Sequence, residues 1–367
     1  MSKISSQEAA PGAEAAGARR HVRSHAAPKK PCSCLVVGLG KQMREVYFPA
    51  LNLTDRIRVA GAVDADPSTQ AIADDAGIEF FSTSLSDALA KLHPDFVLLT
   101  LPHSQYASVT PTLVRQGVPV YQEKPFAANL SDGQAILKSI KKNNGLVHVA
   151  MNRRVHPIYW AARIILATLG DIVHVEGRFT LQIERLDAGW RASHSNSGGG
   201  AILDIGYHAF DLLLWYFGSP TAVSAMTTQR ARPSQIYDVE DTASIKCEYK
   251  GTRNFIATLV LSRVYPEKSD GFTIVGTQGS VVLQRGKLTH FDQTGSLLET
   301  ITREGTWIVG ATHQLLAFTD AVRSKERSEI GNAEYHLQHL NVIDACYRSA
   351  SAGGKKIAVT KPMQEES

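Results

Sequence analysis

Two aspartates and a histidine follow three consecutive glycines in an otherwise apolar stretch. The polar residues are Asp204, His208 and Asp211, and the glycines are 198–200. At positions i, i+4 and i+7 of a helix, these side chains would share one narrow face. Buried Asp and His side chains are unfavourable unless they are paired or used, so two interpretations remain open. Either an Asp–His hydrogen bond stabilises a core helix, or the histidine transfers protons at a site.

The three glycines themselves predict a close approach at the start of this helix. Without a Cβ atom, residues 198–200 would let another backbone segment or a ligand come near. The sequence does not distinguish between these two neighbours.

A lysine in the tripeptide Glu123-Lys124-Pro125 is a second candidate for chemistry. The tripeptide follows a predicted strand at 119–122, so it would lie at the carboxyl edge of a parallel sheet, where such folds bind ligands. There Lys124 could hold a substrate hydroxyl and stabilise a developing alkoxide. The alternative is a solvated Glu–Lys pair at the end of a strand. Pro125 would fix the turn and is a candidate for a cis peptide bond.

A third pattern is typical of a dinucleotide-binding turn. Gly38 and Gly40 lie between a predicted strand at 34–37 and a helical stretch, although Met43 replaces the third glycine of the usual fingerprint. Asp64 ends the second strand at about the expected spacing, where a carboxylate accepts hydrogen bonds from the adenosine ribose and repels a 2′-phosphate. This favours NAD over NADP. A plain glycine turn without a cofactor remains the alternative.

Two different sheets would position these residues. From 34 to 150, short apolar runs alternate with helical segments, which predicts an α/β fold with a doubly wound parallel sheet. After about 152, strand-like runs at 172–182 and between 221 and 292 follow one another with glycines between them. This predicts an α+β domain with one large, mostly antiparallel open sheet, closed by helices at 312–325 and 333–351.

Composition excludes several functional classes. The 39 basic and 35 acidic residues give a net charge of +4, and residues 1–30 carry all of this excess, so the folded body is neutral and predicts no nucleic-acid partner. The four cysteines show no metal or disulfide spacing, which predicts a reducing cytoplasm and no metal. No apolar run approaches the length that spans a membrane, so we expect no membrane association.

Several motifs together resemble the Gfo/Idh/MocA oxidoreductase family. They are the glycine turn followed by Phe48-Pro-Ala-Leu51, then Glu123-Lys124-Pro125, Asn152-Arg-Arg154 with Pro157, Leu169-Gly-Asp-Ile172, Trp190-Arg191, and Gly198-Gly-Gly200 with Asp204-x-Gly206-x-His208-x-x-Asp211. The resemblance extends from Cys34 to about Ile357. The sequence differs from the family pattern at Leu101-Pro-His103-Ser-Gln-Tyr106, where His103 and Tyr106 occupy positions usually held by Asn and His.

This resemblance implies a division of the chain and a set of roles. The Ala-, Gly- and Ser-rich start separately predicts a disordered tail at 1–30. The resemblance implies a dinucleotide-binding Rossmann domain at 31–152 and a substrate-binding and oligomerisation domain at 153–367. The catalytic residues would be Lys124, Asp204 and His208, meeting at the nicotinamide. The expected cofactor residues are Gly38, Gly40, Lys41, Gln42, Met43, Asp64, Leu101, Pro102, His103, Glu123 and Lys124. The expected substrate residues are Lys124, Arg154, His156, Arg191, Tyr207 and His208.

The expected function is therefore hydride transfer between NAD or NADP and a secondary alcohol or ketone of a sugar, cyclitol or related polyol. His208 would exchange the hydroxyl proton, oriented by Asp204. A homodimer or homotetramer would form through the sheet of the second domain. Two alternatives remain: a biosynthetic reductase of a keto-sugar or imine, and a dinucleotide-sensing regulator without turnover.

Overall fold

The computed structural model describes residues 30–303, 307–326 and 331–360. All described elements belong to one compact unit that begins at Pro31. The tail predicted at 1–30 lies, apart from Lys30, outside the described residues. Within those residues, no helix is both long and apolar enough to cross a bilayer.

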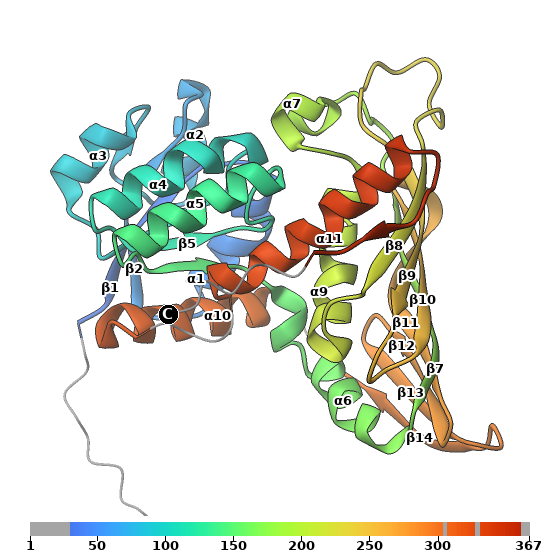
Figure 1. Ribbon diagram of the computed structural model, residues 1–367. Helices are drawn as coiled ribbons and strands as arrows, with labels where there is room; N and C mark the ends of the chain where they lie inside the picture. Colours follow the sequence, from blue (N-terminus) through green and yellow to red (C-terminus); the bar gives the residue numbers. More distant parts are fainter. Residues whose placement is uncertain (1–29, 304–306, 327–330, 361–367) are drawn as a thin grey trace, which may run out of the picture. The chain divides into compact units, whose positions relative to one another are not determined.

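The first sheet is parallel throughout and has the order β3-β2-β1-β4-β5-β6 (Figure 1). Its strands are β1 (Cys32–Val37), β2 (Ile57–Val63), β3 (Phe81–Ser82), β4 (Phe96–Leu99), β5 (Val120–Gln122) and β6 (Val147–Val149). The prediction of a doubly wound sheet is confirmed. The strand order reverses between β1 and β4, and ligands bind such sheets beyond the carboxyl ends at this point.

Helices connect these strands. They are η1 (Met43–Tyr47), α1 (Phe48–Leu51), η2 (Pro67–Thr69), α2 (Gln70–Asp75), α3 (Leu85–Leu92), η3 (His103–Gln105), α4 (Tyr106–Arg115) and α5 (Leu130–Lys142). Among them, η2, α3 and α5 begin at a side-chain cap. Asn129 caps α5 by accepting a hydrogen bond from the backbone N–H of Asp132 at 2.8 Å. The helix predicted after the glycine turn starts as a π-helical turn, η1.

The second sheet has nine strands in the order β14-β13-β12-β11-β7-β10-β9-β8-β15. They are β7 (Ile172–Gln182), β8 (Ala222–Thr228), β9 (Thr242–Tyr249), β10 (Phe255–Ser262), β11 (Val264–Gly276), β12 (Gly279–Gln284), β13 (Lys287–Asp292), β14 (Leu297–Thr302) and β15 (Ile357–Ala358). Neighbours are antiparallel apart from β7 and β10, which confirms a mostly antiparallel sheet. The sequence pattern missed β14, which is exposed along most of its length, and the two-residue β15.

The helices of the second half lie mainly against this sheet. They are η4 (Asn152–Val155), α6 (Pro157–Ile165), η5 (Leu166–Thr168), η6 (Trp190–Ala192), α7 (His194–Ser197), α8 (Ala201–Asp204), α9 (Gly206–Phe217), α10 (Trp307–Ser324) and α11 (Ala333–Ser351). Figure 1 shows α9 and α11 along one face of the sheet, and both contact it. Helix α10 is different, because its Ala311, Leu315 and Phe318 pack in the same core as Val36 and Leu98 of the first sheet.

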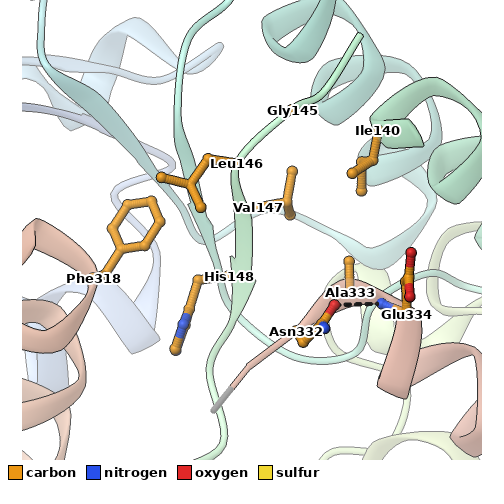
Figure 2. Close-up of a pocket in the computed structure, with 9 residues that line it drawn as sticks. All are labelled: Ile140, Gly145, Leu146, Val147, His148, Phe318, Asn332, Ala333 and Glu334. Atoms are coloured by element: carbon orange, nitrogen blue, oxygen red, sulfur yellow. Dashed lines mark hydrogen bonds between the residues drawn. The ribbon is translucent and has the colours of Figure 1, made fainter. Parts of the chain in front are cut away.

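A small cavity lies beside His148 of β6. Figure 2 shows this ring between Phe318 and the turn where Asn332 caps α11. The cavity holds only about 10 Å³, which is room for about one water molecule. It is too small for a substrate, but it identifies His148 as a buried ring, whose Nε2 has no partner among the described residues.

Buried histidines make the stability of this fold sensitive to acid. His103, His148, His336 and His339 are at most 2% exposed. Burial lowers the pKa of all four, to about 3 for His103 and about 4 for His148. Above pH 6.5 these rings are neutral in both the folded and the unfolded chain. Below that pH, the unfolded chain binds protons that the folded chain does not, so the free energy of unfolding falls.

We therefore expect the free energy of unfolding to fall between pH 6.5 and pH 4, by about 1.4 kcal/mol per pH unit for each such ring. His148→Gln removes one of these titrations outside the site and should flatten the dependence by about that amount. The exposed His313 on α10 provides the matched control, His313→Gln. Urea unfolding at pH 7, 6 and 5 measures the dependence. An equal slope in wild type and His148→Gln would contradict this explanation.

Candidate active site

The three glycines at 198–200 form a junction between segments that are distant in the sequence. A Cβ atom on Gly198 would overlap the carbonyl of Ala128, and one on Gly200 would overlap the carbonyl of Glu240. Gly198 also adopts a positive φ of +77°, which favours glycine. The expected approach of another backbone is confirmed. The alternative approach, that of a ligand, is wrong here, because protein atoms occupy these positions.

The junction leads into a helix that is broken at Ile205. Helix α8 ends at Asp204 and α9 begins at Gly206, so the predicted uninterrupted face does not form. Asp204 and His208 line a cavity, but Asp211 is fully buried against α11, where its Oδ1 lies 2.9 Å from Nε2 of His339. The prediction that all three polar residues share one face is therefore wrong for Asp211.

Lys124 contacts Asp204, as expected if the Glu123-Lys124-Pro125 motif and the motif that contains Asp204 meet at one site. Its Nζ donates hydrogen bonds to both the carbonyl oxygen and Oδ1 of Asp204, each at 2.9 Å. The other carboxylate oxygen, Oδ2, accepts a hydrogen bond from Nε of Arg191 at 3.2 Å. Burial alone would raise the pKa of Asp204, but the charges of Lys124 and Arg191 outweigh it and hold the pKa well below its usual range. Asp204 is therefore an ionised bridge between two cations.

The turn that carries Lys124 is fixed by its neighbours. The Lys124–Pro125 peptide bond is cis. Glu123 is buried and accepts a short hydrogen bond from the hydroxyl of Tyr47 in η1. Gln122 donates to the carbonyls of Pro125 and Phe126 at 3.0 and 2.9 Å. These hydrogen bonds hold the segment that carries Lys124 at the end of β5.

His208 faces the same cavity in its neutral form. Burial lowers the pKa of its imidazole well below the usual value, and the charges of Arg153 and Lys124 lower it further against the opposing charge of Asp204. Its Nδ1 is buried without a hydrogen-bond partner among the described residues. Asp204 therefore influences the ring through its charge, and the expected Asp204–His208 hydrogen bond is not formed between these two described side chains.

His103 occupies the position where the family usually has asparagine. Its Nδ1 lies 2.7 Å from the carbonyl oxygen of Ser197, directly before the three glycines. The ring packs edge-to-face on Trp190, with the ring centroids 4.5 Å apart. The guanidinium of Arg191 lies 4.1 Å from the centroid of the same indole. His103, Trp190 and Arg191 therefore form a contiguous wall.

One cavity of about 760 Å³ brings most of the predicted residues together. Ten of them line it: Gly40, Lys41, Gln42, Leu101, His103, Glu123, Lys124, Arg191, Asp204 and His208. The volume is within the range typical of small-molecule and cofactor sites. The cavity extends from the turn after β1 to the loops and strands of the second sheet, including Thr180 and Ser269.

The glycine turn is stabilised from both adjacent strands. Gly38 has a φ of +89°, and its carbonyl accepts a hydrogen bond from Thr100 Oγ1 at 2.7 Å. Asp64 accepts hydrogen bonds from the backbone N–H of Leu39 at 2.6 Å and of Asp66 at 3.0 Å. Asp64 therefore supports the turn directly, in addition to any contact with a ribose.

Seven predicted residues do not line this cavity: Gly38, Met43, Asp64, Pro102, Arg154, His156 and Tyr207. The last three are buried in the interior. Nε of Arg154 donates to Asp211 Oδ1 at 2.8 Å, and Nδ1 of His156 accepts from the backbone N–H of Ile158 at the start of α6. Tyr207 OH accepts a hydrogen bond from the backbone N–H of Phe126 at 3.2 Å. Tyr207 thus supports the segment that carries Lys124.

Sequence reasoning missed Arg153, which lines the cavity in place of its neighbour Arg154. Nε of Arg153 donates to Asp270 Oδ1 at 3.0 Å, and Tyr159 donates to the same oxygen at 3.1 Å. The signal was present in the Asn152-Arg-Arg154 motif, which gives no indication of which arginine faces inward. Lys268 and Asp270 of β11 were missed because the polar first half of that strand does not alternate.

Comparison with known proteins identifies the family of both halves of the chain. Residues 32–151 match the model of an oxidoreductase family with an NAD-binding Rossmann fold, and residues 161–282 match the GFO/IDH/MocA C-terminal domain. The chain is 23% identical over 321 residues to D-xylose 1-dehydrogenase (NADP(+)) 2 of Haloferax volcanii, covering 83% of this chain and 93% of that protein. An oxidoreductase relative from Amycolatopsis mediterranei is 31% identical over 185 residues, and the chain spans about half of its length (51%).

Among solved structures, a levoglucosan dehydrogenase in complex with NADH and levoglucosan has the same fold. The match has a TM-score of 0.80 at 18% identity and covers 90% of this chain and all of the other. Matches to both halves, in the order found here, establish the relationship. The chain belongs to the Gfo/Idh/MocA family of NAD(P)-dependent oxidoreductases.

Proposed function

We propose that this protein is a dehydrogenase that transfers a hydride between a nicotinamide cofactor and a secondary alcohol of a sugar, cyclitol or related polyol. One observation carries the proposal. Lys124, Asp204 and His208 line the same cavity as the glycine turn at Gly40. A proton acceptor (His208) and a hydrogen-bond donor for a negatively charged substrate oxygen (Lys124) would therefore lie beside a bound dinucleotide.

The lining residues fit a dinucleotide. A Cβ atom built on Gly40 meets nothing within 4 Å, so the turn is open on its cavity side. The backbone N–H groups there could hold a pyrophosphate next to η1. When bound, the nicotinamide would supply the hydride acceptor for the carbon that bears the reacting hydroxyl.

Lys124 and His208 would perform the remaining chemistry. An ammonium group has three donors, and Asp204 takes two of those of Lys124, which leaves one for the substrate oxygen. That contact favours alkoxide character. His208 would take the hydroxyl proton as the C–H bond breaks, because its lowered pKa keeps it in the neutral, proton-accepting form.

Burial and the charges of Arg153 and Lys124 favour the neutral form of His208, which can accept the hydroxyl proton in alcohol oxidation. A reductase of a keto-sugar or imine would need the same ring to donate a proton. A dinucleotide-sensing regulator would have no need of the Lys124–Asp204 pair. Consumption of NADH on adding ketones, without oxidation of the matching alcohols, would instead support the reductase.

Two relatives support a sugar-like substrate by name, a D-xylose dehydrogenase and a levoglucosan dehydrogenase. The test is a thermal-shift comparison of NAD(H) with NADP(H), followed by a turnover screen of sugars and cyclitols. NAD(H) stabilisation together with oxidation of at least one polyol would support the proposal. Binding of a dinucleotide with no turnover of any alcohol or ketone would argue for the regulator.

We expect Asp64 to determine the preference for NAD over NADP. Its carboxylate would accept from the ribose hydroxyls and repel a 2′-phosphate. Asp64→Ser should raise the affinity for NADPH relative to NADH by about tenfold, and both affinities should fall somewhat because Leu39 and Asp66 lose an acceptor. Dissociation constants from NAD(P)H fluorescence measure this ratio.

The neighbouring carboxylate provides the matched control. Asp66 caps its own turn by accepting from the backbone N–H of Ser68 at 2.9 Å. Asp66→Ser should therefore leave the NADPH/NADH ratio as in the wild type. An unchanged ratio in Asp64→Ser would show that another group selects the cofactor.

We also propose that a second copy of the chain covers the open face of the second sheet. Ile256 and Val275, at 42% and 36% exposure, both lie beside His174 of β7 on that face. Exposed apolar side chains that share a face of a sheet are typical of an interface. Light scattering after size exclusion would measure the assembly, and a charged residue at Ile256 should weaken it.

A further inference from the structure

Asp204 holds two cationic donors side by side at the cavity wall. Its Oδ1 binds Lys124 at 2.9 Å and its Oδ2 binds Arg191 at 3.2 Å. Both oxygens of this carboxylate are therefore engaged with protein groups. In the proposed mechanism, the reacting hydroxyl accepts a hydrogen bond from Lys124 and donates its own proton to His208. A hydroxyl that accepts from Arg191 needs another acceptor.

His103 supplies an acceptor in the same cavity wall as Arg191, because both residues line the cavity and both contact Trp190. The carbonyl of Ser197 can only accept, so at 2.7 Å the Nδ1 of His103 must carry the proton. In a neutral imidazole, Nε2 then has a free lone pair. None of the described residues hydrogen-bonds to this nitrogen, and the ring lines the cavity.

The environment of the ring keeps this tautomer through the physiological range. Burial lowers the pKa of His103 to about 3, although the charge of Asp204 opposes the shift. Nε2 therefore accepts hydrogen bonds and does not donate them. A hydroxyl or amide N–H can pair with it, whereas an ether oxygen or a carboxylate cannot.

We propose that His103 is a specificity-determining residue, whose Nε2 accepts a hydrogen bond from the hydroxyl on the carbon adjacent to the reacting one. This inference rests on the proposed function, with the reacting hydroxyl between Lys124 and His208. The adjacent hydroxyl accepts from Arg191 and donates to His103. The enzyme thereby selects vicinal diols in which the second hydroxyl is free.

The first test is on the substrate side and uses the wild-type protein with NAD. Two series of probes serve: trans-1,2-cyclohexanediol with trans-2-methoxycyclohexanol and cyclohexanol, and D-glucose with its 2-O-methyl and 2-deoxy forms. In any series that turns over, the free diol should exceed its ether and deoxy partners in kcat/KM by about tenfold. The ether is the sharper probe, because it can still accept from Arg191 but cannot donate to His103.

The second test changes the residue. His103→Phe removes the acceptor and should reduce the diol-to-ether ratio to about unity, while His103→Asn keeps an amide acceptor and should retain part of it. His194 of α7 is exposed and does not line the cavity, so His194→Asn is the matched control with an unchanged ratio. The dissociation constant of NADH is measured for each variant.

The outcomes separate this inference from the proposed function. If diol and ether have equal kcat/KM while turnover still depends on Lys124, the role of His103 is overturned. The proposed dehydrogenase function is then unaffected. If His103→Phe weakens NADH binding but leaves the diol-to-ether ratio unchanged, Nε2 instead accepts from the carboxamide of the nicotinamide. This result also overturns the role of His103 in substrate selection. Binding of NADH without turnover of any probe or of any polyol in the screen contradicts both proposals.

Discussion

His208→Ala is expected to lower kcat for alcohol oxidation by about 10²–10⁴-fold while NADH binds almost as in the wild type. Without the imidazole, a reacting hydroxyl held by Lys124 loses its proton acceptor, because both carboxylate oxygens of the neighbouring Asp204 are engaged by Lys124 and Arg191. Steady-state kinetics on the best polyol from the screen, with NADH binding by fluorescence, measure the effect.

Added imidazole sharpens this test. The alanine variant leaves space beside the cavity, so free imidazole should restore part of the turnover in His208→Ala. It should have no effect on His313→Ala, the control at an exposed histidine of α10. Turnover within tenfold of the wild type in His208→Ala would remove the ring from the mechanism.

Lys124→Met is expected to lower kcat by about 10²–10³-fold, because the substrate oxygen loses the charged donor that stabilises its alkoxide character. It should also reduce the free energy of unfolding by roughly 2–3 kcal/mol. The side chains of Lys124 and Asp204 are each 13% exposed, and the variant leaves the carboxylate with Arg191 as its remaining cation.

A double variant separates these two effects. Asp204→Asn removes the buried charge that has lost Lys124, so Lys124→Met/Asp204→Asn should regain stability in urea unfolding without regaining turnover. Lys138→Met, at an exposed lysine of α5, is the matched control for both measurements. If the double variant recovered turnover together with stability, the role of Lys124 would be structural.

The elements that carry the site could be predicted because their signals are local. Alternating apolar runs and glycine turns define the first sheet, and a parallel sheet places the ends of β1 and β5 at one edge. The meeting of Lys124 with Asp204 followed from the resemblance of two motifs to one family. Their contact at 2.9 Å agrees with that expectation.

Other features depend on contacts that a local pattern does not contain. The sequence predicts Tyr207 as a substrate residue and Asp211 on the face of Asp204, but they bind His336 and His339 of α11, which lie 129 and 128 residues further along the chain. Likewise α10 packs with Val36 and Leu98, although it follows the whole second sheet in sequence.

The glycine junction before α8 also constrains the order in which this sequence can change. The space for a side chain at Gly198, Gly199 and Gly200 is taken by the Ala128 carbonyl, the Tyr347 hydroxyl and the Glu240 carbonyl, respectively. These neighbours come from three separate parts of the chain. A lineage could therefore gain a side chain at Gly199 only after a smaller residue replaces Tyr347. At Gly198 and Gly200 it would first have to displace a backbone segment, which no single substitution achieves.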